Sequence, residues 1–255
     1  MTRIILHGAN GRMGRAITEI CREDPDATIV AGVDAYGEGD GSFPLFRDIA
    51  ACDVAADAVI DFSNASAVNG VLAYCREKRL PLVLCTTGLN DDQLEAVSQA
   101  SEEIPVLRSG NMSLGVNVML DIVREAAKRL YREGFDVEIV EKHHNQKLDA
   151  PSGTAIMLAD EAKAAVEEEV SYIYHRDDVR IKRDHAEIGI SAVRGGTFVG
   201  DHDVIFAGPD EVVTVSHRAY SRAIFARGAV AAAKFLKGRE AGRYDMRDVI
   251  RGDQS

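Results

Sequence analysis

The sequence has little cysteine or proline and no tryptophan. Its 255 residues include six prolines and four cysteines, and Cys21, Cys52, Cys75 and Cys85 form no C-x-x-C pair. Scattered cysteines predict buried reduced thiols rather than a disulfide framework. No run is long and apolar enough to span a membrane, and the first residues are typical of a strand entering a glycine turn rather than of a leader. We therefore expect a cytoplasmic protein.

Positive charge is also scarce. Thirty Lys and Arg face 41 Asp and Glu, which gives a formal net charge of −11. Nucleic-acid binding needs clustered, unopposed cations, so this balance argues against a nucleic-acid partner. The net charge would also repel a dicarboxylate metabolite, and such a substrate would need a locally basic pocket.

The first part of the chain alternates short apolar runs with amphipathic stretches, as in a doubly wound parallel sheet with helices on both faces. Ser63-Asn64 is a plausible helix cap. The expected strands are 3–6, 28–33, 58–62, 82–85 and 106–107, and the expected helices are 13–22, 65–78 and 91–100.

The rhythm changes after Asn111, which indicates a second domain of the α+β class with an open mixed or antiparallel sheet. A long helix at 114–131 and a turn at Glu133-Gly134 precede strands that we expect to form an antiparallel meander. A helix at 222–235 would return to the first domain, and the tail from Gly238 is expected to be loop. The meander strands are 135–141, 188–193, 199–206 and 212–216.

A glycine-rich turn, G-x-x-G-x-x-G, follows the first strand and precedes the first helix. This context is typical of a Rossmann-type nucleotide site, where glycines let the backbone approach a pyrophosphate at a helix N-terminus. Asp34 ends the next strand, where an acid binds the adenosine ribose hydroxyls. The candidate cofactor contacts here are Gly8, Ala9, Asn10, Gly11, Arg12, Met13 and Asp34.

The same residues bear on the choice between NADH and NADPH. The carboxylate of Asp34 would repel the extra phosphate of NADPH, and Ala35 supplies no positive charge, so NADH is slightly favoured. The Arg12 guanidinium in the turn either pairs with that phosphate or is a solvated loop charge, and the sequence leaves both interpretations open.

Two further segments follow strands at the predicted crevice edge. Small and hydroxylated residues there would let a flat nicotinamide approach backbone amides, although ordinary turn chemistry alone would also account for them. The candidate contacts are Cys85, Thr86, Thr87, Ser109, Gly110, Asn111 and Met112.

The most informative segment is a predicted loop that contains His143, His144 and Lys147. Two histidines can titrate near neutrality and a lysine is a persistent cation. The following Pro151-Ser152-Gly153-Thr154 is typical of a helix start, whose free N–H groups bind carboxylates. The alternatives are a metal site, a solvated loop and simple helix capping. Zinc is disfavoured because no cysteine or H-x-x-x-H spacing accompanies the pair, so we expect no metal.

The run EIVEKHHNQKLDAPSGTA resembles the signature of the dihydrodipicolinate reductase family. Further matches are GANGRMG, SGNMSLGVNVML, VRGGTFVGDHDVIF, SHRAYSR and YDMRDVI, which together cover most of the chain. The resemblance implies NAD(P)H-dependent reduction of 4-hydroxy-tetrahydrodipicolinate to tetrahydrodipicolinate, with loss of water, in the diaminopimelate route to lysine. It also implies a nucleotide-binding domain of residues 1–111 and 222–255, and a substrate domain of residues 112–221 whose open sheet builds a homotetramer.

Carried over by position, the resemblance assigns catalysis to His143 and Lys147. It assigns substrate binding to His144, Ser152, Gly153, Thr154 and Arg222. This chain departs from the family pattern at Cys85, where glycine is usual beside the nicotinamide, and at Ala35, where members that use NADPH often have arginine. The remaining alternatives are another two-domain NAD(P) dehydrogenase of amino-acid metabolism, such as aspartate or homoserine dehydrogenase, and a non-catalytic NADH-binding redox sensor.

Overall fold

The computed structural model describes residues 1–39, 41–177 and 180–252. The chain forms two compact units. The first comprises Met1–Leu114 together with the chain from Arg222 onward, and the second is Gly115–Ser221. No helix in the described residues is long and apolar enough to cross a membrane.

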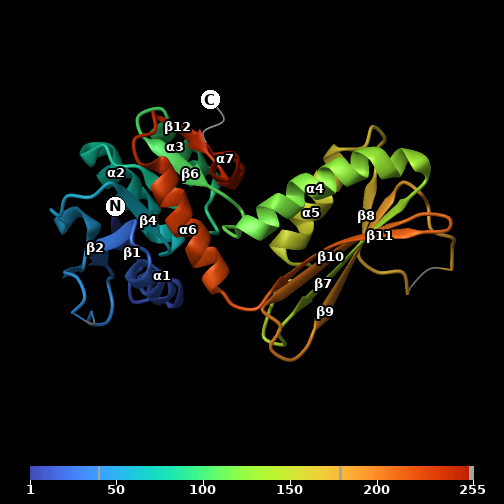
Figure 1. The fold of residues 1–255 in the computed structure, drawn as a ribbon, viewed down its shortest axis with the longest axis horizontal. Coiled ribbons are helices and arrows are strands. Elements are labelled where there is room, and N and C mark those ends of the chain that lie inside the picture. Colours follow the sequence, from blue (N-terminus) through green and yellow to red (C-terminus); the bar gives the residue numbers. More distant parts are fainter. Residues whose placement is uncertain (40, 178–179, 253–255) are drawn as a thin grey trace. The chain divides into compact units, whose positions relative to one another are not determined.

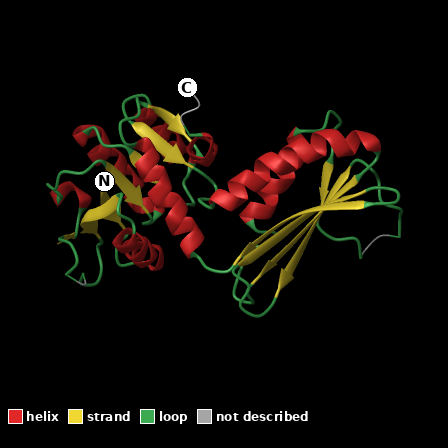
Figure 2. Ribbon diagram, in the orientation of Figure 1, coloured by secondary structure: helices red, strands yellow, loops and turns green. Residues whose placement is uncertain are grey.

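The first unit is a parallel sheet, which Figures 1 and 2 show with its helices. Within the described ranges its seven strands have the order β12-β6-β5-β4-β1-β2-β3. They are β1 (Thr2–His7), β2 (Ala27–Val33), β3 (Leu45–Phe46), β4 (Ala58–Asp61), β5 (Leu82–Leu84), β6 (Pro105–Arg108) and β12 (Gly242–Tyr244).

Helices cover both faces of this sheet because its strands are apolar on both sides. Side chains of α1 (Arg12–Glu23), α6 (Ala223–Leu236) and α7 (Met246–Arg251) share one core with β1, β4 and β5. Side chains of α2 (Val68–Lys78) and α3 (Asp91–Ser101) share the opposite core. The short 3-10 turn η1 (Ile49–Ala51) packs against α2, and a second one, η2 (Ala65–Ala67), leads directly into α2. This arrangement confirms the predicted doubly wound fold.

The second unit is a mixed sheet with helices on one face (Figure 2). Its helices are α4 (Leu114–Leu130) and α5 (Gly153–Ala164), and the turn η3 (Tyr131–Glu133) follows α4. Among the described residues, five strands have the order β11-β10-β7-β9-β8. They are β7 (Asp136–His143), β8 (Ser171–Ile173), β9 (Glu187–Arg194), β10 (Gly200–Ala207) and β11 (Val212–Ala219).

Two expectations from the sequence were wrong. The strands do not form an antiparallel meander, because β9 pairs with β7 in parallel and β8 pairs with β9 in parallel. Helix α5 provides the crossover that a parallel pair requires. The tail after Gly238 is not loop, since it forms β12 and α7, and the Asp245 side chain caps α7 by accepting from the Arg247 and Asp248 amides.

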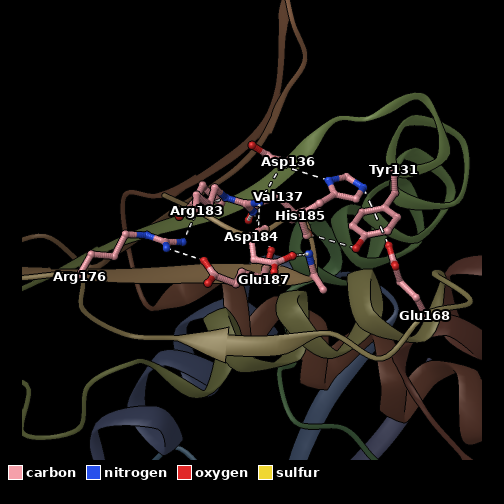
Figure 3. Close-up of polar contacts among 11 residues, drawn as sticks. Tyr131, Asp136, Val137, Glu168, Arg176, Arg183, Asp184, His185 and Glu187 are labelled. Carbon is pink, nitrogen blue, oxygen red and sulfur yellow. Dashed lines mark hydrogen bonds and ion pairs between the residues drawn. The ribbon is translucent and has the colours of Figure 1, made fainter. Parts of the chain in front are cut away.

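One arginine fixes the segment between β8 and β9 to the sheet (Figure 3). Arg183 Nε donates to Glu138 Oε1 (2.9 Å) and Nη1 donates to Asp136 Oδ1 (2.6 Å). Its Nη2 donates to the carbonyls of Val137 (3.2 Å) and Glu187 (2.6 Å). Five side-chain donors on a rigid fork suit this multiple bonding better than a lysine ammonium would. Arg183 therefore ties the segment to both β7 and β9.

Candidate functional site

The glycine loop between β1 and α1 is closely packed. Gly8 has φ +81°, and a Cβ there would lie 2.5 Å from Phe62 O. A Cβ on Gly14 would lie 2.3 Å from Gly8 O. Any larger residue at either position would therefore push the loop away from its neighbours. The loop ends at Gly11, the N-cap of α1, so the free amides of the first helical turn adjoin it.

Asp34 links this loop to the end of β2. Its Oδ2 accepts from the Asn10 amide (2.9 Å) and its Oδ1 accepts from the Tyr36 amide (3.0 Å). A cavity of about 640 Å³ adjoins this linkage. Gly8, Asn10, Gly11, Asp34, Ala35 and Tyr36 are among the residues that line it. The cavity, the close-packed glycines and the acid fit a dinucleotide, with the pyrophosphate at the α1 N-terminus.

The other cofactor candidates follow neighbouring strands of the same sheet. Cys85, Thr86 and Thr87 come after β5, and the segment from Ser109 to Met112 comes after β6. Because β5 and β6 are parallel neighbours, both segments lie at the carboxyl edge of the sheet. The Asn111 side chain accepts from the Ser113 amide (2.8 Å), and the Ser109 hydroxyl donates to Asn111 O (3.0 Å).

A buried carboxylate organises this edge. Asp61, which ends β4, is fully buried. It accepts hydrogen bonds from His7 Nδ1, from the Ser63 hydroxyl and from the Thr86 hydroxyl, each at 2.6 Å. Burial, with a smaller contribution from Asp61, raises the pKa of the Cys85 thiol, which is therefore uncharged at neutral pH. The Cys85 side chain thus adds bulk without adding charge.

In the second unit, β7 places Glu141 and His143 on the buried face of its sheet, because residues two apart in a strand share a face. His143 Nδ1 lies 2.6 Å from Glu141 Oε2. Arg194 forms a bidentate pair with the same carboxylate at 2.7 and 2.6 Å, and the Ser152 amide donates to it at 3.0 Å. Burial opposes the charge of Glu141, but the bonds from Arg194, His143 and Ser152 outweigh it and lower the Glu141 pKa.

The His143 ring also needs space beside the neighbouring strand β10. A Cβ on Gly200 would lie 2.9 Å from His143 Nε2. The His202 ring packs edge-on against His143, with centroids 5.2 Å apart. Burial and the neighbouring His143 lower the pKa of His202 to about 4, so His202 is neutral at pH 7.

Helix α5 begins beside this group. Ser152 is its N-cap and accepts from the Ala155 amide (3.2 Å). The Ser152 hydroxyl also lies 3.0 Å from His202 Nε2. Gly153 is the first residue of the helix and is exposed, with open space where a Cβ would stand. A carboxylate can therefore approach the N-terminus of this helix.

The rest of the loop lies in the same unit. The His144 amide donates to Phe198 O (2.9 Å), and the Lys147 amide donates to His144 O (3.1 Å). The Lys147 ammonium lies 2.9 Å from Asp149. Thr154 is in the first turn of α5. Arg222 belongs to the first unit, where it is the N-cap residue of α6.

Sequence reasoning missed several of these residues. Glu141 has a signal, since it alternates with His143 along one strand. Arg194, Gly200 and His202 lie in the matched run VRGGTFVGDHDVIF, but that match gave them no role, and strand pairing brings them to β7. Asp61 is likewise placed by the pairing of β4 with β1.

A dinucleotide-type parallel sheet in one unit and a histidine–carboxylate site in the other define a two-domain oxidoreductase. The family model for the N-terminus of dihydrodipicolinate reductase matches residues 2–112, and the model for its C-terminus matches residues 115–250. The chain therefore belongs to the dihydrodipicolinate reductase family.

Individual proteins agree with this assignment. The 4-hydroxy-tetrahydrodipicolinate reductase of Caldanaerobacter subterraneus subsp. tengcongensis is 49% identical over 98% of this chain and 99% of its own length. The same-named protein of Clostridium tetani is 49% identical over 96% of each. The structure of dipicolinate-bound dihydrodipicolinate reductase from Paenisporosarcina sp. TG-14 has a TM-score of 0.80 at 22% identity, and covers 96% of this chain and 97% of that one. That likeness confirms the fold.

Proposed function

We propose that this chain reduces 4-hydroxy-tetrahydrodipicolinate to tetrahydrodipicolinate, with loss of water, in the diaminopimelate route to lysine. One observation carries the proposal. His143 is bonded to a buried carboxylate beside the accessible N-terminus of α5, in a chain whose close relatives have the name of this activity.

The first unit binds the cofactor in this proposal. The glycine loop from Gly8 to Met13 receives the pyrophosphate, and Asp34 receives the ribose hydroxyls. The segments at Cys85 to Thr87 and Ser109 to Met112 adjoin the nicotinamide. A reduced nicotinamide supplies the hydride when it is bound there.

The second unit binds a dicarboxylate. The start of α5 at Gly153 and Thr154 receives one carboxylate, Ser152 contributes by capping that turn, and His144 and Lys147 add donors. These groups offset the substrate charge that the acidic chain otherwise opposes.

His143 holds a proton at a defined atom. A carboxylate only accepts hydrogen bonds, so Nδ1 of His143 carries a hydrogen toward Glu141. Its Nε2 is then the atom that takes up or releases a proton at the substrate. Lys147 is the second group that can deliver the proton to the reduced ring.

The proposal extends to assembly and location. The face of the second sheet that α4 and α5 leave open bears Val193 and Val212, which are 44% and 61% exposed. We assign this face to a homotetramer. The four free thiols suit a cytoplasmic, reducing compartment.

The test is oxidation of NADH and of NADPH by the purified chain, with substrate formed in situ from pyruvate and aspartate semialdehyde by a coupling synthase. We expect turnover that falls about a hundredfold or more in His143→Ala, the range of general acid–base catalysis. His175→Ala, which removes an exposed histidine of the same unit, is the matched control and should retain activity. Absence of turnover from folded protein that binds NADH would sink the proposal.

A further inference from the structure

Arg47 is a cation at the adenosine end of the cofactor cavity that sequence reasoning did not connect with Asp34. Strand β3 pairs with β2, and Val33 lies opposite Phe46. The Asp34 amide donates to Phe46 O (2.9 Å). The residue after Phe46 is therefore brought beside the turn that follows Asp34, although twelve positions separate Arg47 from Ala35 in the sequence.

Backbone carbonyls hold the Arg47 guanidinium at this turn. Nη1 donates to Gly37 O (2.5 Å) and lies 3.5 Å from Ala35 O. No carboxylate pairs with Arg47 in residues 1–39, 41–177 and 180–252. Among these described residues, its positive charge is therefore not paired with a carboxylate at the rim of the cavity that it lines.

The other charged side chains that line the cavity are acidic, so Arg47 is needed there to attract a phosphate. Asp34 and Asp48 also line the cavity, and both carboxylates would repel a phosphate. Asp48 is partly engaged, since it accepts from the Ala50 amide (3.0 Å). Arg12, the cation that the glycine motif offers, is not among the lining residues. Among the described residues that line the cavity, Arg47 is thus the arginine that would face a bound phosphate.

We infer that Arg47 is the specificity-determining residue that lets this chain accept a 2′-phosphorylated dinucleotide, NADPH, as well as NADH. The inference rests on the proposed function and refines its cofactor. Asp34 serves the ribose hydroxyls of NADH, whereas the Arg47 guanidinium serves the 2′-phosphate of NADPH through Nε and Nη2, which donate to no residue that the structure describes.

The test uses ligands without a nicotinamide, so that binding is measured without turnover. ADP-ribose and its 2′-phosphate are titrated by calorimetry into the full chain. A charge-assisted hydrogen bond is worth about 1.5–3 kcal/mol, or roughly ten- to a hundredfold in affinity. Arg47→Gln should lower the affinity for the 2′-phosphate ligand by about that factor. It should lower the affinity for ADP-ribose by less than about threefold. Arg47→Lys, which keeps the charge without the fork, should fall between.

Two further variants complete the design. Arg129→Gln removes one exposed positive charge from α4 of the second unit and should change neither affinity. Equal weakening of both ligands in Arg47→Gln would assign Arg47 to the turn alone and overturn the inference. The inference would also be overturned if Arg12→Gln selectively weakened binding of the 2′-phosphate ligand and Arg47→Gln did not. Failure of wild-type protein to bind either ligand would instead contradict the proposed function.

Discussion

Glu141 is fully buried beside His143, and its charge determines which nitrogen of the ring carries a hydrogen. Arg194 neutralises Glu141 through two hydrogen bonds, so the carboxylate does not bind the proton that His143 must release. A buried charge with these partners stays ionised, because its pKa is lowered despite burial. The group resembles an orienting acid behind a general base.

Glu141→Gln should therefore impair catalysis more than binding. A glutamine amide can donate to Nδ1 and favour the opposite tautomer, which would leave a hydrogen on Nε2. We expect kcat to fall about a hundredfold with KM changed less than about threefold. Steady-state kinetics across pH measures both. Glu138→Gln, on the opposite face of β7, is the matched control for loss of one carboxylate, and kcat within threefold of wild type in Glu141→Gln would refute this role.

His202 should make the folded state sensitive to moderate acid. Its pKa is about 4 when folded, against 6.5 ordinarily. Below pH 6.5 the unfolded chain therefore binds a proton that the folded chain does not, and stability decreases as pH falls toward 4. In His202→Gln this contribution is absent, so stability should fall less between pH 7 and pH 5. Urea unfolding at several pH values compares the two proteins, and parallel curves would contradict the prediction.

At the scale of elements, regular periodicity was predictable and strand partners were not. The long runs that became α4, β7 and β10 were predicted within a few residues. Strands β3, β8 and β12 have only two or three residues, too few for a periodic pattern, and neighbouring strands stabilise them. The parallel pairing of β9 with β7 depends on contacts between distant segments, which alternation of apolar residues does not encode.

Arg183 should contribute more to the free energy of unfolding than an arginine in an exposed ion pair does. Its side chain is 19% exposed and bonds both β7 and β9. Arg183→Met would leave Asp136 and Glu138 without this partner, and we expect a loss of about 1–3 kcal/mol in the free energy of unfolding. Arg132→Met, which breaks an exposed pair with Glu167, should cost less than about 1 kcal/mol. Chemical denaturation measures both, and equal losses would show that Arg183 is an ordinary surface charge.

For the whole molecule, the open face of the second sheet should control assembly. Val212→Glu places a charge on that face, and burying an unpaired charge at an interface is unfavourable. We expect light scattering after gel filtration to show species smaller than a tetramer. Ile122→Glu, at a 47% exposed position on α4, should leave assembly unchanged. A tetramer that persists in Val212→Glu would place the interface elsewhere.

The candidate site was predictable where chemistry is local in sequence. The glycine loop, the His143 segment and the α5 start each occupy a few consecutive residues, and the motif alone indicates them. Asp61, Arg47, Arg194 and His202 act through residues ten or more positions away, so only the fold brings them to these partners.

The division of the chain also has a consequence for biosynthesis. The second unit is one uninterrupted segment, whereas the first needs α6, which packs against β1, β4, β5 and β6. A ribosome releases the whole inserted unit before it releases α6, so the face of the parallel sheet that α1 and α6 share lacks α6 until the second unit has been synthesised. Domains generally fold as units while the chain emerges. We therefore expect the second unit to fold before the first is completed. The nascent chain would then form its nucleotide pocket last.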